Sequence, residues 1–200
     1  MPVPPYYAAD PFLAVQRALV TPWLDAPMEL VTRACEGWAV GLIGLAYLAW
    51  RALPRAGAAG ARAAKLLGLL RLFAPLVLAL VSVGFAVQGL KLLAHTPRPL
   101  AVYGPDGIHQ LLEPLRQGGF PSGHSASAAT LAAYGSGRFG RTAWPLWLFA
   151  LLGGLSRIYV GAHWTLDVVG GLALGALFGW VAYALAQRSG LVPLPDPRSP

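Results

Sequence analysis

The sequence predicts an all-α protein in which a bundle of helices crosses a membrane. Of its 200 residues, 56% are hydrophobic and only 12% are charged, whereas soluble domains average about 25% charged residues. The charged residues lie between long uncharged runs and form no basic face. So little charge cannot easily cover a water-exposed surface, which disfavours a soluble enzyme. Because the charges form no basic face, the net charge of +7 does not indicate nucleic-acid binding.

The first candidate elements lie in the N-terminal quarter of the chain. Residues 11–34 form a weak segment, because Arg17, Asp25, Glu29 and Arg33 interrupt its apolar residues. We interpret this segment as an interfacial helix or as the start of the first span. The run Gly37–Trp50 has 14 uncharged residues. It is short for a span, and it can lengthen if flanking charged side chains snorkel.

Four further runs complete the bundle. Leu72–Leu90 and Val168–Gln187 have 19 and 20 uncharged residues, enough to cross a core of about 30 Å at about 1.5 Å per residue. Between them, Ser122–Gly137 is rich in Ser, Ala and Gly, which suits a helix enclosed by other helices. Thr142–Ser156 is shorter, with 15 residues. We therefore expect five transmembrane helices, or six if the N-terminal segment also crosses.

The charges predict the orientation of these spans. If the five runs alternate in direction, nine of the 15 Lys and Arg residues fall on one side with a single acid, Asp196: Arg51, Arg55, Arg62, Lys65, Arg71, Arg138, Arg141, Arg188 and Arg198. The positive-inside rule makes that side cytoplasmic. The tryptophans Trp38, Trp50, Trp144 and Trp164 fall near the ends of the runs, as residues of the membrane interface do. We expect a multi-pass protein of the cell membrane.

Three motifs gather unusual polar residues on the opposite side. The first is Lys91 with Arg98-Pro99, the second is Pro121-Ser122-Gly123-His124, and the third is Ser156-Arg157 with His163 and Asp167. Lys91, Arg98 and Arg157 offer three positive charges, and arginine has a planar fork that suits phosphate oxygens. Ser122 is a plausible N-cap, so N–H groups near Ser122 and Gly123 would point at an anion. These residues therefore predict a phosphate site.

His163 and Asp167 are four residues apart. On a helix they would share one face, so that the carboxylate holds one ring nitrogen and leaves the other as a nucleophile. The set includes two histidines, His124 and His163. An unperturbed histidine side chain has a pKa near 6.5, which suits proton transfer at neutral pH. The only carboxylate of the set is committed to His163. We therefore expect no metal ion and no other cofactor.

Together the motifs resemble the type 2 phosphatidic acid phosphatase (PAP2) family, which shares its site with vanadium haloperoxidases and glucose-6-phosphatase. The resemblance covers residues 36–187 and implies a PAP2-like transmembrane phosphatase domain there, after the N-terminal segment 1–35. Residues 188–200 are Pro-rich, and we expect a disordered cytoplasmic tail. The resemblance also implies that His163 attacks phosphorus to form a phosphohistidine and that His124 protonates the leaving oxygen.

We thus expect a metal-independent lipid phosphatase that acts at the periplasmic or outer face. Its partners would be membrane lipids and a lipid phosphate substrate: undecaprenyl diphosphate first, then phosphatidylglycerol phosphate or phosphatidic acid. A non-catalytic phospholipid-binding or transport protein is the alternative. A vanadate-dependent haloperoxidase is a third possibility, but those enzymes are soluble. Gly171, Gly175 and Gly179 form a small-residue stripe, for which packing inside the bundle is favoured over dimerisation; the oligomeric state stays open.

Overall fold

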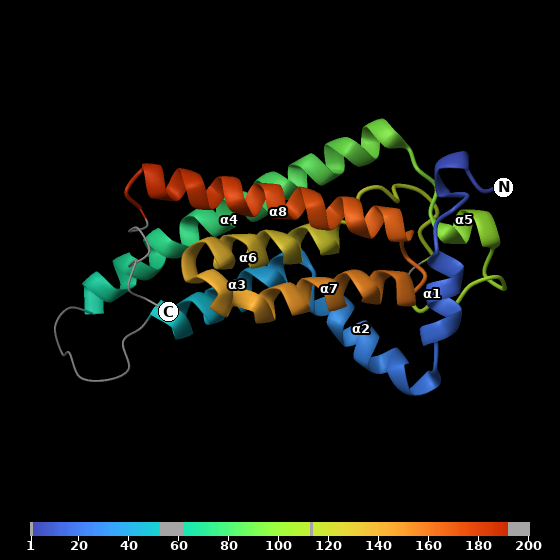
Figure 1. Ribbon diagram of the computed structural model, residues 1–200, viewed down its shortest axis with the longest axis horizontal. Helices are drawn as coiled ribbons and strands as arrows, with labels where there is room; N and C mark the ends of the chain where they lie inside the picture. The colour runs from blue at the N-terminus through green and yellow to red at the C-terminus, as the bar shows by residue number, and fades with distance from the viewer. Residues whose placement is uncertain (1, 53–61, 113, 192–200) are drawn as a thin grey trace.

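The computed structural model describes residues 2–52, 62–112 and 114–191. Five long helices form a bundle (Figure 1): α3 (Gly37–Ala52), α4 (Arg62–Ala94), α6 (Gly123–Phe139), α7 (Trp144–Tyr159) and α8 (Thr165–Arg188). The shorter elements are η1 (Pro5–Tyr7), α1 (Phe12–Leu19), η2 (Pro22–Leu24), α2 (Asp25–Ala34), α5 (Pro99–Tyr103) and η3 (Gly140–Ala143). Within the described ranges the only β-type pairing is an isolated bridge between Pro97 and Gln117. The predicted all-α fold is confirmed.

Helix α6 lies at the centre of the bundle, with α3, α4, α7 and α8 packed around it. Ten of its residues are buried, and most of them are alanine or other small residues. Small side chains let the surrounding helices approach its backbone closely. The prediction that this segment is enclosed by other helices is therefore confirmed.

The closest helix packing joins α6 to α8 through the three glycines of the predicted stripe. Gly171, Gly175 and Gly179 are all buried in this interface. A Cβ atom at any of them would collide with a carbonyl oxygen of α6, at Ser122, Ala126 and Thr130 respectively. The stripe thus packs inside the bundle, as predicted.

Among the described residues, two helices are long and apolar enough to cross a membrane, over Leu67–Ala94 and Thr165–Arg188. Only 33% and 22% of their most apolar windows are buried inside the protein. Large apolar side chains therefore face outward, including Phe85 at 76% exposure and Leu78 at 67%. Such a surface suits lipid better than water. Helices α3, α6 and α7 have 16, 17 and 16 residues, so the count of five or six spans stays a prediction.

The N-terminal segment is not one helix, as the sequence had predicted for residues 11–34. It divides into α1, the short turn η2 and α2. With 8 and 10 residues, neither α1 nor α2 can cross about 30 Å at about 1.5 Å per residue. Both contact α7, and α1 lies near the N-terminus at one end of the bundle (Figure 1).

The predicted C-terminal tail and the basic linker are only partly described. Helix α8 continues to Arg188, the first residue of the predicted tail, and residues 192–200 lie outside the described ranges. Of the linker between the first two runs, residues 53–61 also lie outside them. The predicted disorder of the tail is therefore not tested.

Candidate active site

The three sequence motifs meet at one end of the bundle, where α4 and α7 end and α6 and α8 begin (Figure 1). A cavity of about 520 Å³ opens there, which we call the site cavity. Six of the eight predicted site residues line it: Lys91, Arg98, Gly123, His124, Arg157 and His163. Lys91 and His163 are 72 residues apart in the chain, so the fold brings distant segments to one cavity.

Ser122 is the predicted ligand that the structure does not place on the cavity wall. It is the N-cap of α6, as predicted, and its Oγ accepts a hydrogen bond from the Ser125 backbone N–H. Its own backbone N–H donates to the Asp167 carbonyl at 2.9 Å, so that group is not available to an anion. The N–H groups of Gly123 and His124 lie in the first turn of α6, where no intrahelical acceptor exists. The helix N-terminus can therefore still face an anion through these two residues.

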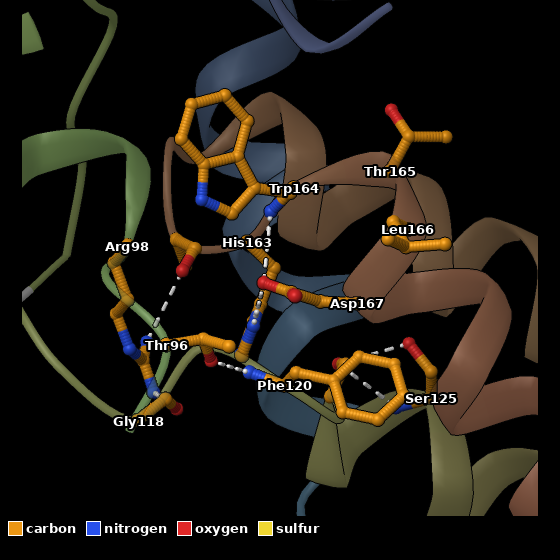
Figure 2. Close-up of polar contacts among 12 residues, drawn as sticks. Thr96, Arg98, Gly118, Phe120, Ser125, His163, Trp164, Thr165, Leu166 and Asp167 are labelled. Carbon is orange, nitrogen blue, oxygen red and sulfur yellow. Dashed lines mark hydrogen bonds and ion pairs between the residues drawn. The ribbon is translucent and has the colours of Figure 1, made fainter. Parts of the chain in front are cut away.

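Arg98 is fixed in place by backbone carbonyls. Its side chain is only 6% exposed. Nε donates to Gln117 O at 3.0 Å, Nη1 to Ala162 O at 3.2 Å and Nη2 to Gly118 O at 3.3 Å; Figure 2 shows Gly118 beside the Arg98 guanidinium. These bonds use three of the five guanidinium N–H groups and hold the fork against the cavity.

Arg157 is as deeply buried as Arg98 but is held differently. It is 5% exposed, and its Nε is buried without a hydrogen-bond partner. Its backbone carbonyl accepts from the N–H groups of Ala162 and His163 at 3.0 and 3.2 Å, which folds the loop back over the end of α7. A buried guanidinium donor without an acceptor is costly, and the cavity beside it is the place from which an acceptor could come.

The site cavity has an excess of positive charge. The ion pairs among the described residues are Arg33–Glu29, His109–Asp25 and His163–Asp167, so Lys91, Arg98 and Arg157 have no carboxylate partner there. Glu36 is the acid that lines the cavity. Three close cations favour an anion with more than one negative charge. In the described part of the chain, no group of three or more His, Cys, Asp or Glu side chains is arranged to hold a metal ion.

His163 and Asp167 form a pair, but not on one helical face as predicted. His163 precedes α8, and Asp167 lies in its first turn. Asp167 Oδ2 accepts from the Trp164 backbone N–H at 3.1 Å and lies 3.3 Å from His163 Nδ1. Figure 2 shows the carboxylate turned toward both residues. Because a carboxylate only accepts, Nδ1 carries the proton and Nε2 keeps its lone pair.

The surroundings of His163 keep its imidazole neutral. The side chain is 1% exposed, and burial lowers the pKa of His163 well below its ordinary value of 6.5. The positive charges of Arg98, Arg157 and Lys91 lower the pKa further. A neutral imidazole has the free lone pair that a nucleophile needs.

The cavity continues beyond its charged end in two directions. Apolar residues of α4 line its other wall: Leu80, Val83, Gly84 and Val87. A second cavity of about 400 Å³ shares Arg98, His124 and Arg157 with it and extends toward Glu29 and Leu112. The three cations Lys91, Arg98 and Arg157 therefore lie between an apolar cleft and a polar one.

Sequence reasoning missed the contribution of the first ten residues. Tyr7 donates from its hydroxyl to Asp167 Oδ1, and its ring stacks on Trp164. Trp164 is fully buried and donates from Nε1 to Pro97 O at 2.9 Å, so its predicted place at the membrane interface is wrong. Trp38, Trp50 and Trp144 are exposed, at 68%, 62% and 64%. Nothing in the composition of the N-terminus signals a contact with a motif 160 residues away.

Comparisons with known proteins agree with this architecture. The family model described as PAP2 superfamily matches residues 72–191. The undecaprenyl-diphosphatase BcrC of Bacillus subtilis is 32% identical over 98 residues, which are 49% of each chain. The lipid A 4'-phosphatase of Porphyromonas gingivalis is 36% identical over 67 residues, 32% of this chain and 28% of that protein. The chain thus matches about half of one of these curated relatives and less of the other.

Two solved structures share the fold over most of the chain. The LpxE structure from Aquifex aeolicus superposes with a TM-score of 0.67 at 26% identity, covering 94% of this chain and 99% of that one. A transmembrane PAP2-type phosphatidylglycerolphosphate phosphatase from Bacillus subtilis superposes with a TM-score of 0.60 at 21% identity, covering 88% and 85%. Because the family model spans more than half of the sequence and the three motifs meet in one cavity, the chain belongs to the PAP2 superfamily.

Proposed function

We propose that this protein is a membrane lipid phosphatase that hydrolyses a phosphomonoester or diphosphate through a phosphohistidine, without a metal ion. The observation that carries the proposal is the site cavity itself. Three cations that form no ion pair with any described carboxylate stand beside a buried imidazole that Asp167 orients. A binding protein would need the cations, but it would not need a nucleophile held by a carboxylate.

In the first half of the reaction, Arg98, Arg157 and Lys91 bind the phosphoryl oxygens. His163 Nε2 attacks phosphorus and forms a P–N bond, while the bond to the leaving oxygen breaks and its electron pair stays on that oxygen. His124 lines the same cavity and gives this oxygen a proton. The positive charge that develops on the His163 ring is stabilised by Asp167.

In the second half, water attacks the phosphohistidine. His124, now without its proton, accepts a proton from that water as the P–O bond forms. The P–N bond breaks, and its electron pair returns to Nε2. Phosphate leaves, and both histidines are restored. The three cations supply the charge stabilisation that a metal ion provides in other phosphatases.

A lipid substrate is favoured over a soluble phosphate by the shape of the cavity. Its charged end suits the phosphate, and the apolar wall of α4 suits a hydrocarbon chain. The outward-facing apolar side chains of α4, such as Phe85 and Leu78, would let that chain extend into the bilayer. Undecaprenyl diphosphate is our first candidate, because the BcrC relative is named an undecaprenyl-diphosphatase.

Lipid A is a second candidate, because the Porphyromonas gingivalis relative is named a lipid A 4'-phosphatase. Both candidates present a phosphate on a large lipid, so the same cavity residues serve either one. The polar cavity beside the site, lined by Glu29, Thr32 and Arg33 among others, offers hydrogen-bonding groups that suit a sugar headgroup better than a plain prenyl chain.

The site is proposed to face the periplasm or the cell exterior. The basic residues Arg51, Arg138, Arg141 and Arg188 stand at the ends of α3, α6 and α8 or in η3, away from the end that holds the cavity. By the positive-inside rule those ends are cytoplasmic. The cavity then opens at the opposite face.

The test is phosphate release by purified protein in detergent with EDTA. The panel holds undecaprenyl diphosphate, lipid A, phosphatidylglycerol phosphate and phosphatidic acid. We expect turnover of at least one lipid, its loss in His163→Ala, inhibition by vanadate, and acid-labile, base-stable phosphate trapped on His163. Binding of these lipids without any release would favour the non-catalytic alternative. Activity that needs added magnesium, or that persists in His163→Ala, would overturn the mechanism.

A further inference from the structure

Tyr7 lies against the catalytic pair although it is 156 residues from His163 in sequence. The residue ends η1 and is only 2% exposed. Its ring stacks on the Trp164 ring, with centroids 4.6 Å apart and an interplanar angle of 13°. Trp164 directly follows His163, so Tyr7 packs on the segment that presents the nucleophile. The region matched by the family model begins only at residue 72, and Tyr7 lies outside it.

The two oxygens of Asp167 have different partners. Oδ1 accepts from the Tyr7 hydroxyl at 2.5 Å. Oδ2 accepts from the Trp164 N–H and faces His163 Nδ1 at 3.3 Å. A rotation of the carboxylate about its Cβ–Cγ bond would break both sets of contacts. The Tyr7 hydroxyl therefore fixes the angle at which Oδ2 faces His163.

The segment that carries Tyr7 has a separate anchor. Asp10 Oδ1 accepts from the Thr165 N–H at 3.1 Å, and Asp10 Oδ2 accepts from the Leu166 N–H at 2.8 Å. Asp10 Oδ1 also accepts from the Phe12 N–H at 2.9 Å. One carboxylate thus joins the start of α1 to the start of α8. The segment stays attached when the Tyr7 hydroxyl alone is removed, which makes a clean variant available.

We propose that Tyr7 is a positioning residue for the His163–Asp167 pair. It acts through Asp167 and touches no substrate, since it does not line the site cavity. In the transition state His163 must stay aligned with phosphorus while its ring becomes positive, and Asp167 Oδ2 must stay on Nδ1. The Tyr7 hydroxyl holds that carboxylate in place before the substrate arrives. The inference rests on the proposed phosphatase function.

The matched variants are Tyr7→Phe and Tyr6→Phe. Each removes one hydroxyl and keeps the ring, but Tyr6 is 56% exposed, and the hydroxyl that bonds Asp167 is that of Tyr7. We expect Tyr7→Phe to lower kcat about tenfold with KM within about twofold, because the loss concerns only the transition state. Tyr6→Phe should keep both constants. Rates are measured well below the unfolding temperature of each variant, so a change in stability does not enter the comparison.

A second readout does not depend on turnover. In protein labelled with ¹⁵N-histidine, the His163 signals are assigned by their loss in His163→Asn. Tyr7→Phe should shift the His163 Nδ1 signal, because the carboxylate that accepts from it can turn. Tyr6→Phe should leave the signal in place.

The two readouts separate the failure of this inference from failure of the proposed function. If the wild type releases phosphate from no lipid, the proposed function fails, and the Nδ1 signal alone decides the role of Tyr7. An unchanged His163 signal in Tyr7→Phe overturns the positioning role. So does a wild-type kcat in that variant, or a raised KM with unchanged kcat.

Discussion

Arg98 and Arg157 line the same cavity at nearly equal burial, yet within the described part of the chain only the Arg98 guanidinium is hydrogen-bonded to backbone carbonyls. Arg157 has a buried Nε with no partner. The difference separates two roles that a sequence motif cannot distinguish. Arg98 both holds the surrounding loops together and offers charge to the cavity, whereas Arg157 offers charge at a cost in stability.

Alanine variants of these two arginines should therefore differ. Each loses a charge-assisted contact of about 1.5–3 kcal/mol, so kcat/KM should fall at least about tenfold in both. Arg98→Ala should also lower the unfolding temperature, because the carbonyls of Gln117, Gly118 and Ala162 lose their donors. Arg157→Ala should leave the unfolding temperature unchanged or raise it.

The measurement is phosphate release together with thermal unfolding in the same detergent. Lysine at either position should restore little activity, since it lacks the planar fork. Wild-type activity in both alanine variants would mean that the two arginines do not bind the substrate.

The apolar wall of the site cavity predicts a dependence on the length of the lipid chain. Gly84 lines that wall, and a Cβ added to it meets no atom within 4 Å. Gly84→Leu would therefore fold normally and place a side chain of four carbons in the path of a hydrocarbon tail. Gly89 is also on α4 with open space around it, and it does not line the cavity, so Gly89→Leu is the matched control.

We expect Gly84→Leu to lower kcat/KM for a long-chain lipid phosphate by about tenfold, roughly the effect of losing the burial of two methylene groups. A short-chain analogue with the same headgroup should be hydrolysed at the wild-type rate. The apolar wall would not bind the lipid chain if kcat/KM fell equally for both chain lengths. The same would follow if the two leucine variants had equal effects.

The burial of His163 predicts how stability depends on pH. The pKa of His163 is lowered in the folded protein. At a pH between this lowered pKa and the ordinary value of 6.5, the ring is protonated in the unfolded chain and neutral in the folded protein. Stability contributed by the neutral ring is then complete above pH 6.5 and is lost as the pH falls below it. In His163→Asn the unfolding temperature should fall less than in the wild type between about pH 7.5 and about pH 5. Parallel curves for the two proteins would show that His163 is protonated in the fold.

Hydrophobic patterning was sufficient to locate all five long helices, because uncharged runs and their flanking charges are local properties of the sequence. The glycine stripe on α8 also predicted close packing inside the bundle, because small residues at a spacing of four form one continuous face. The motifs named the three cations that line the site cavity, Lys91, Arg98 and Arg157. The motifs could not predict which partners each of these residues binds. Ser122 caps α6 as predicted, but its own backbone N–H is taken by the Asp167 carbonyl, a contact that the motif does not show.

The His163–Asp167 pair shows the same limit. Spacing alone suggested one helical face, whereas Asp167 reaches back from the first turn of α8 to a residue before the helix. Tyr7 and Asp10 carry no motif and depend on a long-range fold of the N-terminus onto α8. Trp164 was placed at the membrane interface because tryptophan is common there, but tertiary packing against Tyr7 and Phe12 buries it. The contacts of Tyr7, Asp10 and Trp164 are long-range, so no local pattern in the sequence shows them.

The orientation of the site can be tested with single cysteines. Cys35 is fully buried and is replaced by serine to remove background labelling. Asp106 and Arg141 are both exposed. Asp106 lies in the loop before α6, on the side of the site cavity, and Arg141 lies in η3 at the other end of α6. If the basic end is cytoplasmic, a membrane-impermeant thiol reagent should label Asp106→Cys in intact cells and label Arg141→Cys only after the cells are opened. The reverse pattern would place the site cavity inside the cell, and the lipid phosphate would then have to be supplied by the inner leaflet.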